Sequence, residues 1–175
     1  MLTLEPKTRQ RLALMMQRVL IVDPDPLAAR ALSDLIRQLA PCQVWTAADG
    51  DVAMQLAARI DPHVVFAELA PDGGAFVADL RRSVIACRKA PVIMLAGEVT
   101  ARAIIAARDA GANELLRRPC TVEALFDRIR AGVFDGREWI EAAGYVGPDR
   151  RRFNAGDCMP EARRRGDGAP AAAAA

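Results

Sequence analysis

The sequence contains few of the residues on which histidine or cysteine chemistry depends. His63 is the single histidine among 175 residues, so neither a histidine catalytic pair nor a histidine zinc site can be assembled. We interpret it as a strand-edge residue. The four cysteines are scattered and lack the close pairs of zinc and redox motifs, which predicts reduced, mostly buried thiols. They are Cys42, Cys87, Cys120 and Cys158.

Long apolar runs and an excess of one charge are also absent. No run approaches the length of a membrane span, and residues 12–16 are too short for the apolar core of a signal peptide. The formal net charge is +2, from 24 basic and 22 acidic residues, so the net charge does not predict a protein that coats nucleic acid. With 52% hydrophobic residues, the chain is expected to be a cytoplasmic protein with one ordinary domain plus extensions.

Three short apolar runs end where polar or small residues begin. Residues 18–22 lead into Asp23 and Asp25, residues 62–67 lead into Glu68, and residues 91–95 lead into Ala96. Amphipathic helical patterns separate these runs, which indicates parallel strands with crossover helices. Ligand sites in such sheets lie beyond the carboxyl ends of the strands, so Asp23 and Glu68 are expected to converge. From its own stretch alone, Glu68 is better explained as a helix cap or a solvent-facing acid.

The alternation predicts five strands and five helices over roughly residues 18–131. Asp25 is the expected N-cap of the first of these helices, Thr121 caps the last, and Gly111 ends the one before it. The expected core positions of the second and third helices are Val52, Leu56, Ile60, Phe76, Val77, Leu80, Val84 and Ile85.

Extensions flank this region on both sides. Residues 1–17 predict a short helix after Pro6 with Leu12, Met15 and Met16 on one side, which would dock, grip a partner or fray. Residues 18–134 form the main domain. Residues 135–175 are an arginine-rich tail that packs briefly over residues 136–146 and ends in a low-complexity GAPAAAAA segment predicted to be disordered.

Four motifs of the main domain resemble the receiver domain of two-component response regulators. They are RVLIVDPDP at 18–26, PHVVFAELAPDGG at 62–74, PVIMLAG at 91–97 and AGANELLRRPC at 110–120. The resemblance implies an α/β, flavodoxin-like (βα)5 doubly wound parallel sheet. It also implies a non-enzymatic signalling role with a protein partner, such as a histidine kinase, a phosphotransferase or a motor component.

The sequence departs from this family at the phosphorylation site. In the family, two adjacent acids and an acceptor aspartate hold a magnesium ion, and the aspartate receives a phosphoryl group. Asp23 matches the first acid, but Pro24 stands at the second, and Asp25 is one position late and is expected to face the helix cap. Glu68 stands at the acceptor position, one methylene longer than aspartate. With one acid lost, Asp23 is a weak metal ligand or none, and magnesium binding is doubtful.

Two further positions of the phosphorylation site also differ from the family. Ala96 replaces the hydroxyl residue that bonds the phosphoryl group, and Arg118 replaces the lysine, followed by the expected Pro119. These changes predict a pseudo-receiver in which Arg118 pairs with Glu68. The pair would either mimic the active state or only stabilise the fold, and a receiver that still accepts phosphate is the enzyme-class alternative.

The tail carries two arginine triplets and no clustered lysine, which suits phosphate and guanine recognition. It resembles the arginine-rich extensions of receiver-like proteins that bind cyclic di-GMP and act at the flagellar motor. The resemblance implies that the triplets grip the nucleotide, with Tyr145 or Phe153 stacking on a base. A solvated tail and a nucleic-acid regulator are the alternatives, the latter opposed by the acids in the tail. The triplets are Arg150, Arg151, Arg152, Arg163, Arg164 and Arg165.

Overall fold

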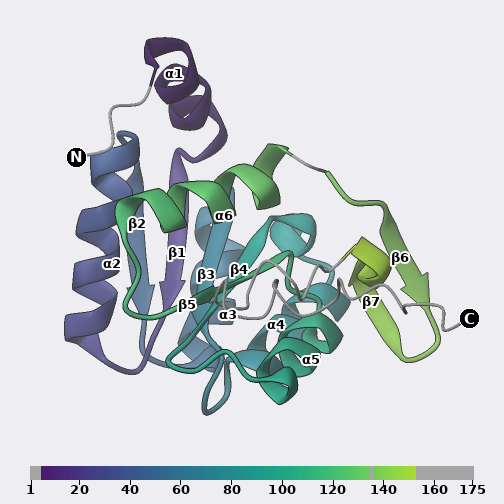
Figure 1. The fold of residues 1–175 in the computed structure, drawn as a ribbon. Helices are drawn as coiled ribbons and strands as arrows, with labels where there is room; N and C mark the ends of the chain where they lie inside the picture. Colours follow the sequence, from purple (N-terminus) through teal and green to yellow (C-terminus); the bar gives the residue numbers. More distant parts are fainter. Residues whose placement is uncertain (1–4, 135, 153–175) are drawn as a thin grey trace, which may run out of the picture.

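The computed structural model describes residues 5–134 and 136–152, and its centre is a five-stranded parallel sheet in the order β2-β1-β3-β4-β5 (Figure 1). This is the flavodoxin-like order, which confirms the predicted fold class. The strands are β1 (Arg18–Val22), β2 (Gln43–Ala47), β3 (Val64–Glu68), β4 (Val92–Ala96) and β5 (Glu114–Arg117).

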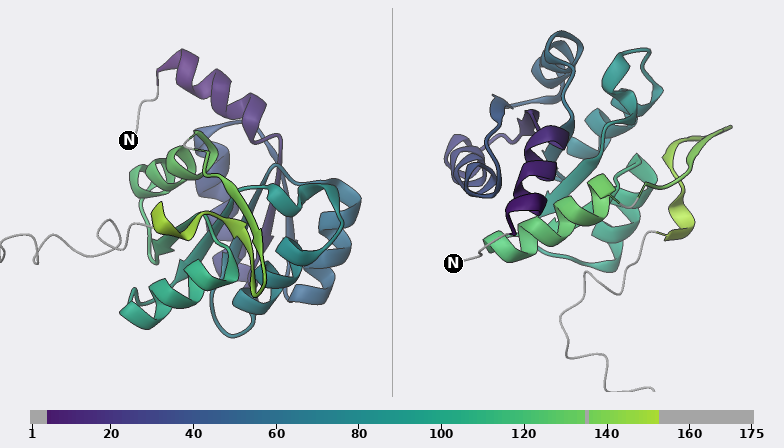
Figure 2. Two further views of the ribbon diagram at one scale, coloured as in Figure 1. Left: turned by 90° about the vertical axis from the view of Figure 1, so that its right-hand side faces the viewer. Right: turned by 90° about the horizontal axis from the view of Figure 1, so that it is seen from above.

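Helices cover both faces of the sheet (Figures 1 and 2). On one face α2 (Pro26–Leu39) contacts α6 (Val122–Phe134). On the other, α4 (Gly73–Arg82) contacts both α3 (Gly50–Ile60) and α5 (Ala101–Ala110). A short 3-10 helix, η1 (Ala86–Lys89), connects α4 to β4.

The two helical layers explain why the central strands read as continuous apolar runs. In β4, Val92 and Met94 join the core under α3, α4 and α5, whereas Ile93 and Leu95 join the core under α2 and α6. Alternate side chains of a strand point to opposite faces, and here both faces are buried.

Capping residues set the helix boundaries where the sequence predicts them. The Asp25 carboxylate accepts a hydrogen bond from the backbone N–H of Leu27, and the Thr121 hydroxyl accepts one from Ala124. Gly111 ends α5 with a φ of 96°, a left-handed conformation that glycine adopts without strain. These three predictions are confirmed.

The predicted core faces of α3 and α4 are wrong in part. In α3 the fully buried positions are Ala53 and Ala57, while Val52 is 42% exposed, because a helix packed this close to β1, β2 and α4 accepts small side chains. Helix α4 ends before Val84, which is 99% exposed, and Ile85 is only partly buried. Apolar spacing alone did not reveal where α4 stops.

The N-terminal helix α1 (Pro6–Met15) docks on the domain between α2 and α6 (Figure 2, right). Leu12 and Met16 are fully buried in the core under α2 and α6, and the Arg11 guanidinium lies 4.5 Å from the centroid of the Phe134 ring. Met15 is 44% exposed, so its predicted place beside Leu12 is wrong. Burial of two large side chains fixes a helix too short to be stable alone.

Beyond α6 the chain forms an antiparallel hairpin of β6 (Trp139–Ala142) and β7 (Tyr145–Pro148), followed by the 3-10 helix η2 (Arg150–Arg152). The sequence predicted only a short packed segment here. Gly144 turns the hairpin with a φ of 86°. Residues 153–175, with their second arginine triplet and Cys158, lie outside the described residues.

Across the described ranges 5–134 and 136–152, no helix has the length and apolar character required to cross a lipid bilayer.

Candidate functional site

The predicted site residues lie together at the carboxyl edge of the sheet. Asp23 follows β1, Glu68 ends β3, Ala96 ends β4 and Arg118 follows β5. Parallel pairing aligns these ends. In β3, Glu68 is in register with Leu95 of β4, and Ala67 is in register with Val22, the last residue of β1. The convergence expected from the strand pattern is present.

Arg118 lies between the two acids of the site. Its Nη2 atom is 3.0 Å from Oε2 of Glu68 and makes a short hydrogen bond to Oδ2 of Asp23. The Asp23 side chain is only 2% exposed. One guanidinium therefore bridges the first-strand acid and the acid at the acceptor position; the sequence predicted its pairing with Glu68 but not with Asp23.

The second oxygen of Asp23 is also engaged. Oδ1 accepts a hydrogen bond of 2.9 Å from the backbone N–H of Asp25. The side chain of Asp25 turns away to cap α2, as the sequence predicted, and Pro24 contributes no carboxylate. Both Asp23 oxygens thus have protein partners.

Glu68 is held mainly by the charge of Arg118. Burial raises the pKa of Glu68, Arg118 opposes that rise, and the neighbouring Asp23 adds to it. Within the described part of the chain, Oε2 of Glu68 has no hydrogen bond of good geometry, although the Arg118 contact is an ion pair. The carboxylate therefore depends on one cation that it shares with Asp23.

Ala96 is buried at the end of β4 and offers only its backbone to the site. Its carbonyl oxygen accepts a hydrogen bond of 2.8 Å from the backbone N–H of Arg118. A methyl side chain cannot donate to a phosphoryl oxygen. The position nevertheless helps to place Arg118.

Gly73, which the sequence analysis did not single out as a site residue, fixes how close α4 comes to Glu68. A Cβ on Gly73 would lie 1.7 Å from the Glu68 carbonyl oxygen, so only glycine fits. A hollow of ≈ 90 Å³ lies beside this contact. It is lined by Glu68, Gly73 and Phe76, among others.

The donor set does not fit the magnesium ion that the family implies. Magnesium requires near-octahedral oxygen ligands. Both oxygens of Asp23 are occupied, Pro24 replaces the second acid, and Arg118 places positive charge between the remaining carboxylates. Over residues 5–134 and 136–152, no group of three or more His, Cys, Asp or Glu side chains is arranged to hold a metal ion.

The remaining candidate residues lie outside this edge. His63 immediately precedes β3, where burial lowers its pKa, and Nδ1 has no hydrogen-bond partner within the described ranges. Cys42, Cys87 and Cys120 are free thiols, and burial raises the pKa of each. Raised thiol pKa values indicate unreactive cysteines.

Sequence reasoning missed Arg81, a fully buried cation near the end of α4. Its side chain donates to the carbonyl oxygens of Gly111 at 2.9 Å, Arg88 at 2.7 Å and Ala90 at 2.8 Å, and to Oδ1 of Asn113 at 2.9 Å. Burial lowers its pKa to about 10. Because it resembles an ordinary surface arginine in sequence, no pattern could have identified it.

Trp139 of the hairpin packs against this end of α4. Three cations lie over its ring, with Arg81 at 5.5 Å, Arg88 at 5.7 Å and Lys89 at 5.3 Å from the centroid. Arg88 also pairs with Glu141 at 2.6 Å. These contacts attach β6 to α4 and η1.

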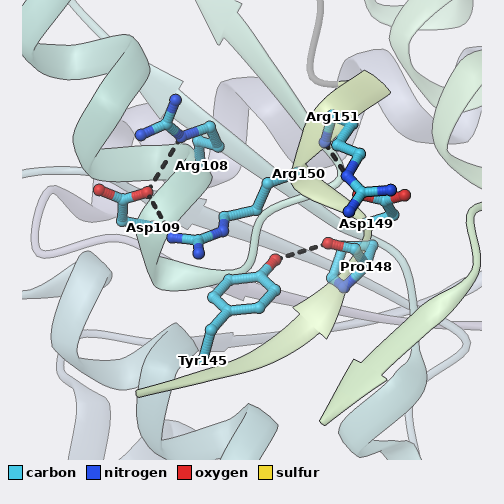
Figure 3. Close-up of polar contacts among 7 residues, drawn as sticks. All are labelled: Arg108, Asp109, Tyr145, Pro148, Asp149, Arg150 and Arg151. Atoms are coloured by element: carbon cyan, nitrogen blue, oxygen red, sulfur yellow. Dashed lines mark hydrogen bonds and ion pairs between the residues drawn. The ribbon is translucent and has the colours of Figure 1, made fainter. Parts of the chain in front are cut away.

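The first arginine triplet follows β7 and begins at an ion pair with α5 (Figure 3). Arg150 Nη1 is 3.2 Å from Oδ1 of Asp109, and its guanidinium lies 4.3 Å from the centroid of the Tyr145 ring. The Tyr145 hydroxyl donates to the carbonyl oxygen of Pro148 at 2.6 Å. Tyr145 is buried and covered by Arg150, so its predicted exposure to a nucleotide base is not found in this conformation.

Arg151 is exposed, and its backbone N–H donates to Oδ1 of Asp149 at 2.9 Å (Figure 3). A hollow of ≈ 290 Å³ between the hairpin and η2 is lined by Tyr145, Arg150 and Arg151 together with Glu138 and Asp149. The predicted stacking residue Phe153 and the triplet 163–165 lie outside the described residues.

Comparisons with known proteins agree with this fold. A model of the family described as the response regulator receiver domain matches residues 19–130. A probable chemotaxis protein CheY of Rhizobium etli is 30% identical over 117 residues, which cover 65% of this chain and 90% of that protein.

Longer regulators match as well. The dual master transcriptional regulator RpaA of Synechocystis, described as DNA-binding, is 33% identical over 122 residues, covering 66% of this chain and 48% of that protein. The transcriptional regulatory protein KdpE of Mycobacterium tuberculosis is 32% identical over 119 residues, covering 67% and 51%. The chain spans about half the length of these two relatives.

Solved structures show the same architecture. A putative response regulator from Chloroflexus aurantiacus has a TM-score of 0.62 at 26% identity, covering 68% of this chain and 98% of that one. The receiver domain of the Pseudomonas aeruginosa histidine kinase PA1611, solved with magnesium coordinated in its active-site cleft, has a TM-score of 0.60 at 21% identity, covering 68% and 98%. The chain belongs to the response regulator receiver family.

Proposed function

We propose that the protein is a pseudo-receiver: a signalling module that docks a partner protein without being phosphorylated. The observation that carries the proposal is the position of Arg118, which bridges Asp23 and Glu68 where a receiver would hold its metal ion and phosphoryl group. The guanidinium supplies one positive charge where magnesium would bring two, and its Nη2 atom is already engaged by Asp23 and Glu68.

Two features oppose phosphoryl transfer to Glu68. Phosphoryl transfer depends on positioned positive charge and donors around the transferring oxygens. The Ala96 side chain supplies no donor, and Pro24 occupies the position where a second acid would help to hold a metal ion.

The proposed docking surface is the face made by α5, β5 and α6. A hollow of ≈ 320 Å³ opens there between β5 and α6 and extends to Val99, just before α5. Its charged lining residues are Arg117, Asp127 and Arg128. Receiver domains generally interact with protein partners such as histidine kinases. A kinase, a phosphotransferase or a motor component is the partner class we propose for this face.

Incubation with acetyl phosphate or phosphoramidate and Mg²⁺ tests the proposal. We expect no acyl phosphate, measured as the absence of an acid-stable, hydroxylamine-labile mass increase of one phosphoryl group. A receiver domain with an intact aspartate site, treated in parallel, is the positive control. Stoichiometric labelling of Glu68 or Asp23 would favour the phospho-accepting alternative.

A second candidate function, nucleotide binding by the tail, is favoured by the hollow beside η2. It places Arg150 and Arg151 next to the aromatic ring of Tyr145, a combination suited to a phosphate-bearing ligand with a guanine base. Cyclic di-GMP is the ligand we propose. Calorimetric titration should show binding that is lost when both arginine triplets become alanine, with GTP as competitor. Binding of duplex DNA with a steep salt dependence would instead support the nucleic-acid alternative.

A further inference from the structure

The segment after α6 is held firmly at its base. Arg137 Nη2 pairs with Oε1 of Glu114 at 2.9 Å, and both side chains are about nine-tenths buried, with exposures of 10% and 11%. The turn of α5 and the end of β7 touch closely, since a Cβ on Gly147 would lie 3.1 Å from Cα of Gly111. The Arg81 contacts fix the same region.

The end of the segment is held differently. The Arg150–Asp109 pair is 3.2 Å long, and its side chains are 46% and 44% exposed. Exposed ion pairs contribute little to stability. A stronger anion can therefore displace Asp109 from Arg150 without disturbing the base of the hairpin.

Asp109 keeps a cation when Arg150 leaves. Arg108 Nε donates to Oδ1 of Asp109 at 3.0 Å, the same oxygen that Arg150 contacts (Figure 3). The Arg108 hydrogen bond is the main reason that the pKa of Asp109 is lowered, with Arg150 adding to it. Two guanidinium groups thus share one carboxylate oxygen, and either can be released.

The guanidinium of Arg150 lies over an aromatic ring whose position is fixed. The Tyr145 ring beneath it is buried and anchored through its hydroxyl to Pro148. A phosphodiester bound beside η2 would offer Arg150 paired oxygens that match its planar fork, and Arg151 is exposed next to it.

We propose that Arg150 is a latch between the tail and α5, which a phosphate-bearing ligand opens by replacing Asp109 as its partner. The latch rests on the proposed nucleotide role of the tail. Because α5 is part of the proposed docking face, opening the latch uncovers Asp109 on that helix, while the contact of Gly111 with Gly147 persists. Ligand binding and partner docking are then linked through a single ion pair.

Calorimetric titration of the full chain with cyclic di-GMP tests the latch through Asp109→Asn. Removing the competing carboxylate should tighten binding about two- to five-fold, the equivalent of an exposed ion pair. Asp51→Asn, which removes the same charge from an exposed position of α3, is the matched control and should bind as the unmodified protein does.

The outcomes separate the two proposals. Binding that Asp109→Asn leaves unchanged, or that Asp51→Asn tightens equally, overturns the latch while the nucleotide role stands. No binding by the unmodified protein overturns both. A carboxyl ¹³C titration gives an independent readout, because saturation with ligand should raise the pKa of Asp109 towards its ordinary value, whereas a pKa that does not move contradicts the latch.

Discussion

At the scale of single residues, the site is organised by one cation shared between two acids. Arg118 offsets the charges of Asp23 and Glu68 at a place where burial already disfavours an ionised carboxylate. In water such a pair would contribute little, but here the alternative to pairing is two like charges facing each other in a half-buried site.

Replacing Arg118 with methionine should therefore lower the free energy of unfolding by about 1–3 kcal/mol at neutral pH, measured by urea denaturation. Arg117→Met is the matched control, because the neighbouring side chain is exposed, and it should change stability by less than about 0.5 kcal/mol. Equal losses in the two variants would show that Arg118 does not hold the site together.

The loss in Arg118→Met should depend on pH. With the cation gone, Asp23 and burial raise the pKa of Glu68 further, so over the range above its ordinary value of 4.5 the folded state binds more protons than the unfolded state. Stability must then fall as pH rises through this range and recover below it. Glu68→Gln in the same background should abolish the dependence; a variant whose stability is flat from pH 4 to 7 would contradict the assignment.

At the scale of secondary-structure elements, α4 connects the site to the C-terminal hairpin. Its first residue, Gly73, touches the Glu68 carbonyl, and Arg81 near its other end binds the α5–β5 turn and Trp139. The contact of Gly73 is too close to accommodate a side chain without movement.

Two adjacent glycines allow a controlled test of the first contact. Gly73→Ala should lower the free energy of unfolding by about 2–4 kcal/mol, because its Cβ would meet the Glu68 backbone oxygen at 1.7 Å. Gly74→Ala has open space at the same point, and alanine favours the helix, so this variant should be neutral or more stable by up to about 1 kcal/mol. Thermal unfolding of the two proteins decides, and a tolerated Gly73→Ala would refute the close approach of α4.

Arg81→Met should release the hairpin. The substitution leaves the carbonyl groups of Gly111, Arg88 and Ala90 without their buried donor, and each such loss costs about 1–3 kcal/mol before relaxation. Hydrogen exchange should become faster at the amides of β6 and β7, while Arg82→Met, at the exposed next position, should leave them protected. If the hairpin amides stay protected in Arg81→Met, the contacts of Trp139 and Arg137 are sufficient to hold the hairpin on the domain.

At the scale of the whole molecule, the sequence predicted what depends on pattern and missed what depends on close packing. The order of strands and helices and the caps at Asp25 and Thr121 follow from periodicity and capping chemistry. The convergence of the strand ends follows from the rule that parallel strands end at one edge, and the pairing of Arg118 with Glu68 was implied by the resemblance to the receiver family. The buried alanines of α3, the role of Gly73 and the burial of Arg81 depend on distances between elements, which no local pattern encodes.

The hairpin illustrates the same limit. Residues 139–148 show aromatic and β-branched side chains, but two four-residue strands are too short for a distinct period-two signal. Their order comes from contacts with α4, η1 and the α5–β5 turn, all distant in sequence.

The central claim is that the edge of the sheet neither binds magnesium nor responds to a phosphoryl group. The most direct measurement is a ¹H–¹⁵N correlation spectrum of the full chain titrated with Mg²⁺ and then with beryllofluoride, a stable analogue of an acyl phosphate. We predict no saturable shifts at the amides of residues 23, 68, 96 and 118. Saturable shifts at these positions that spread into α5 would show a working phosphorylation switch and contradict the account.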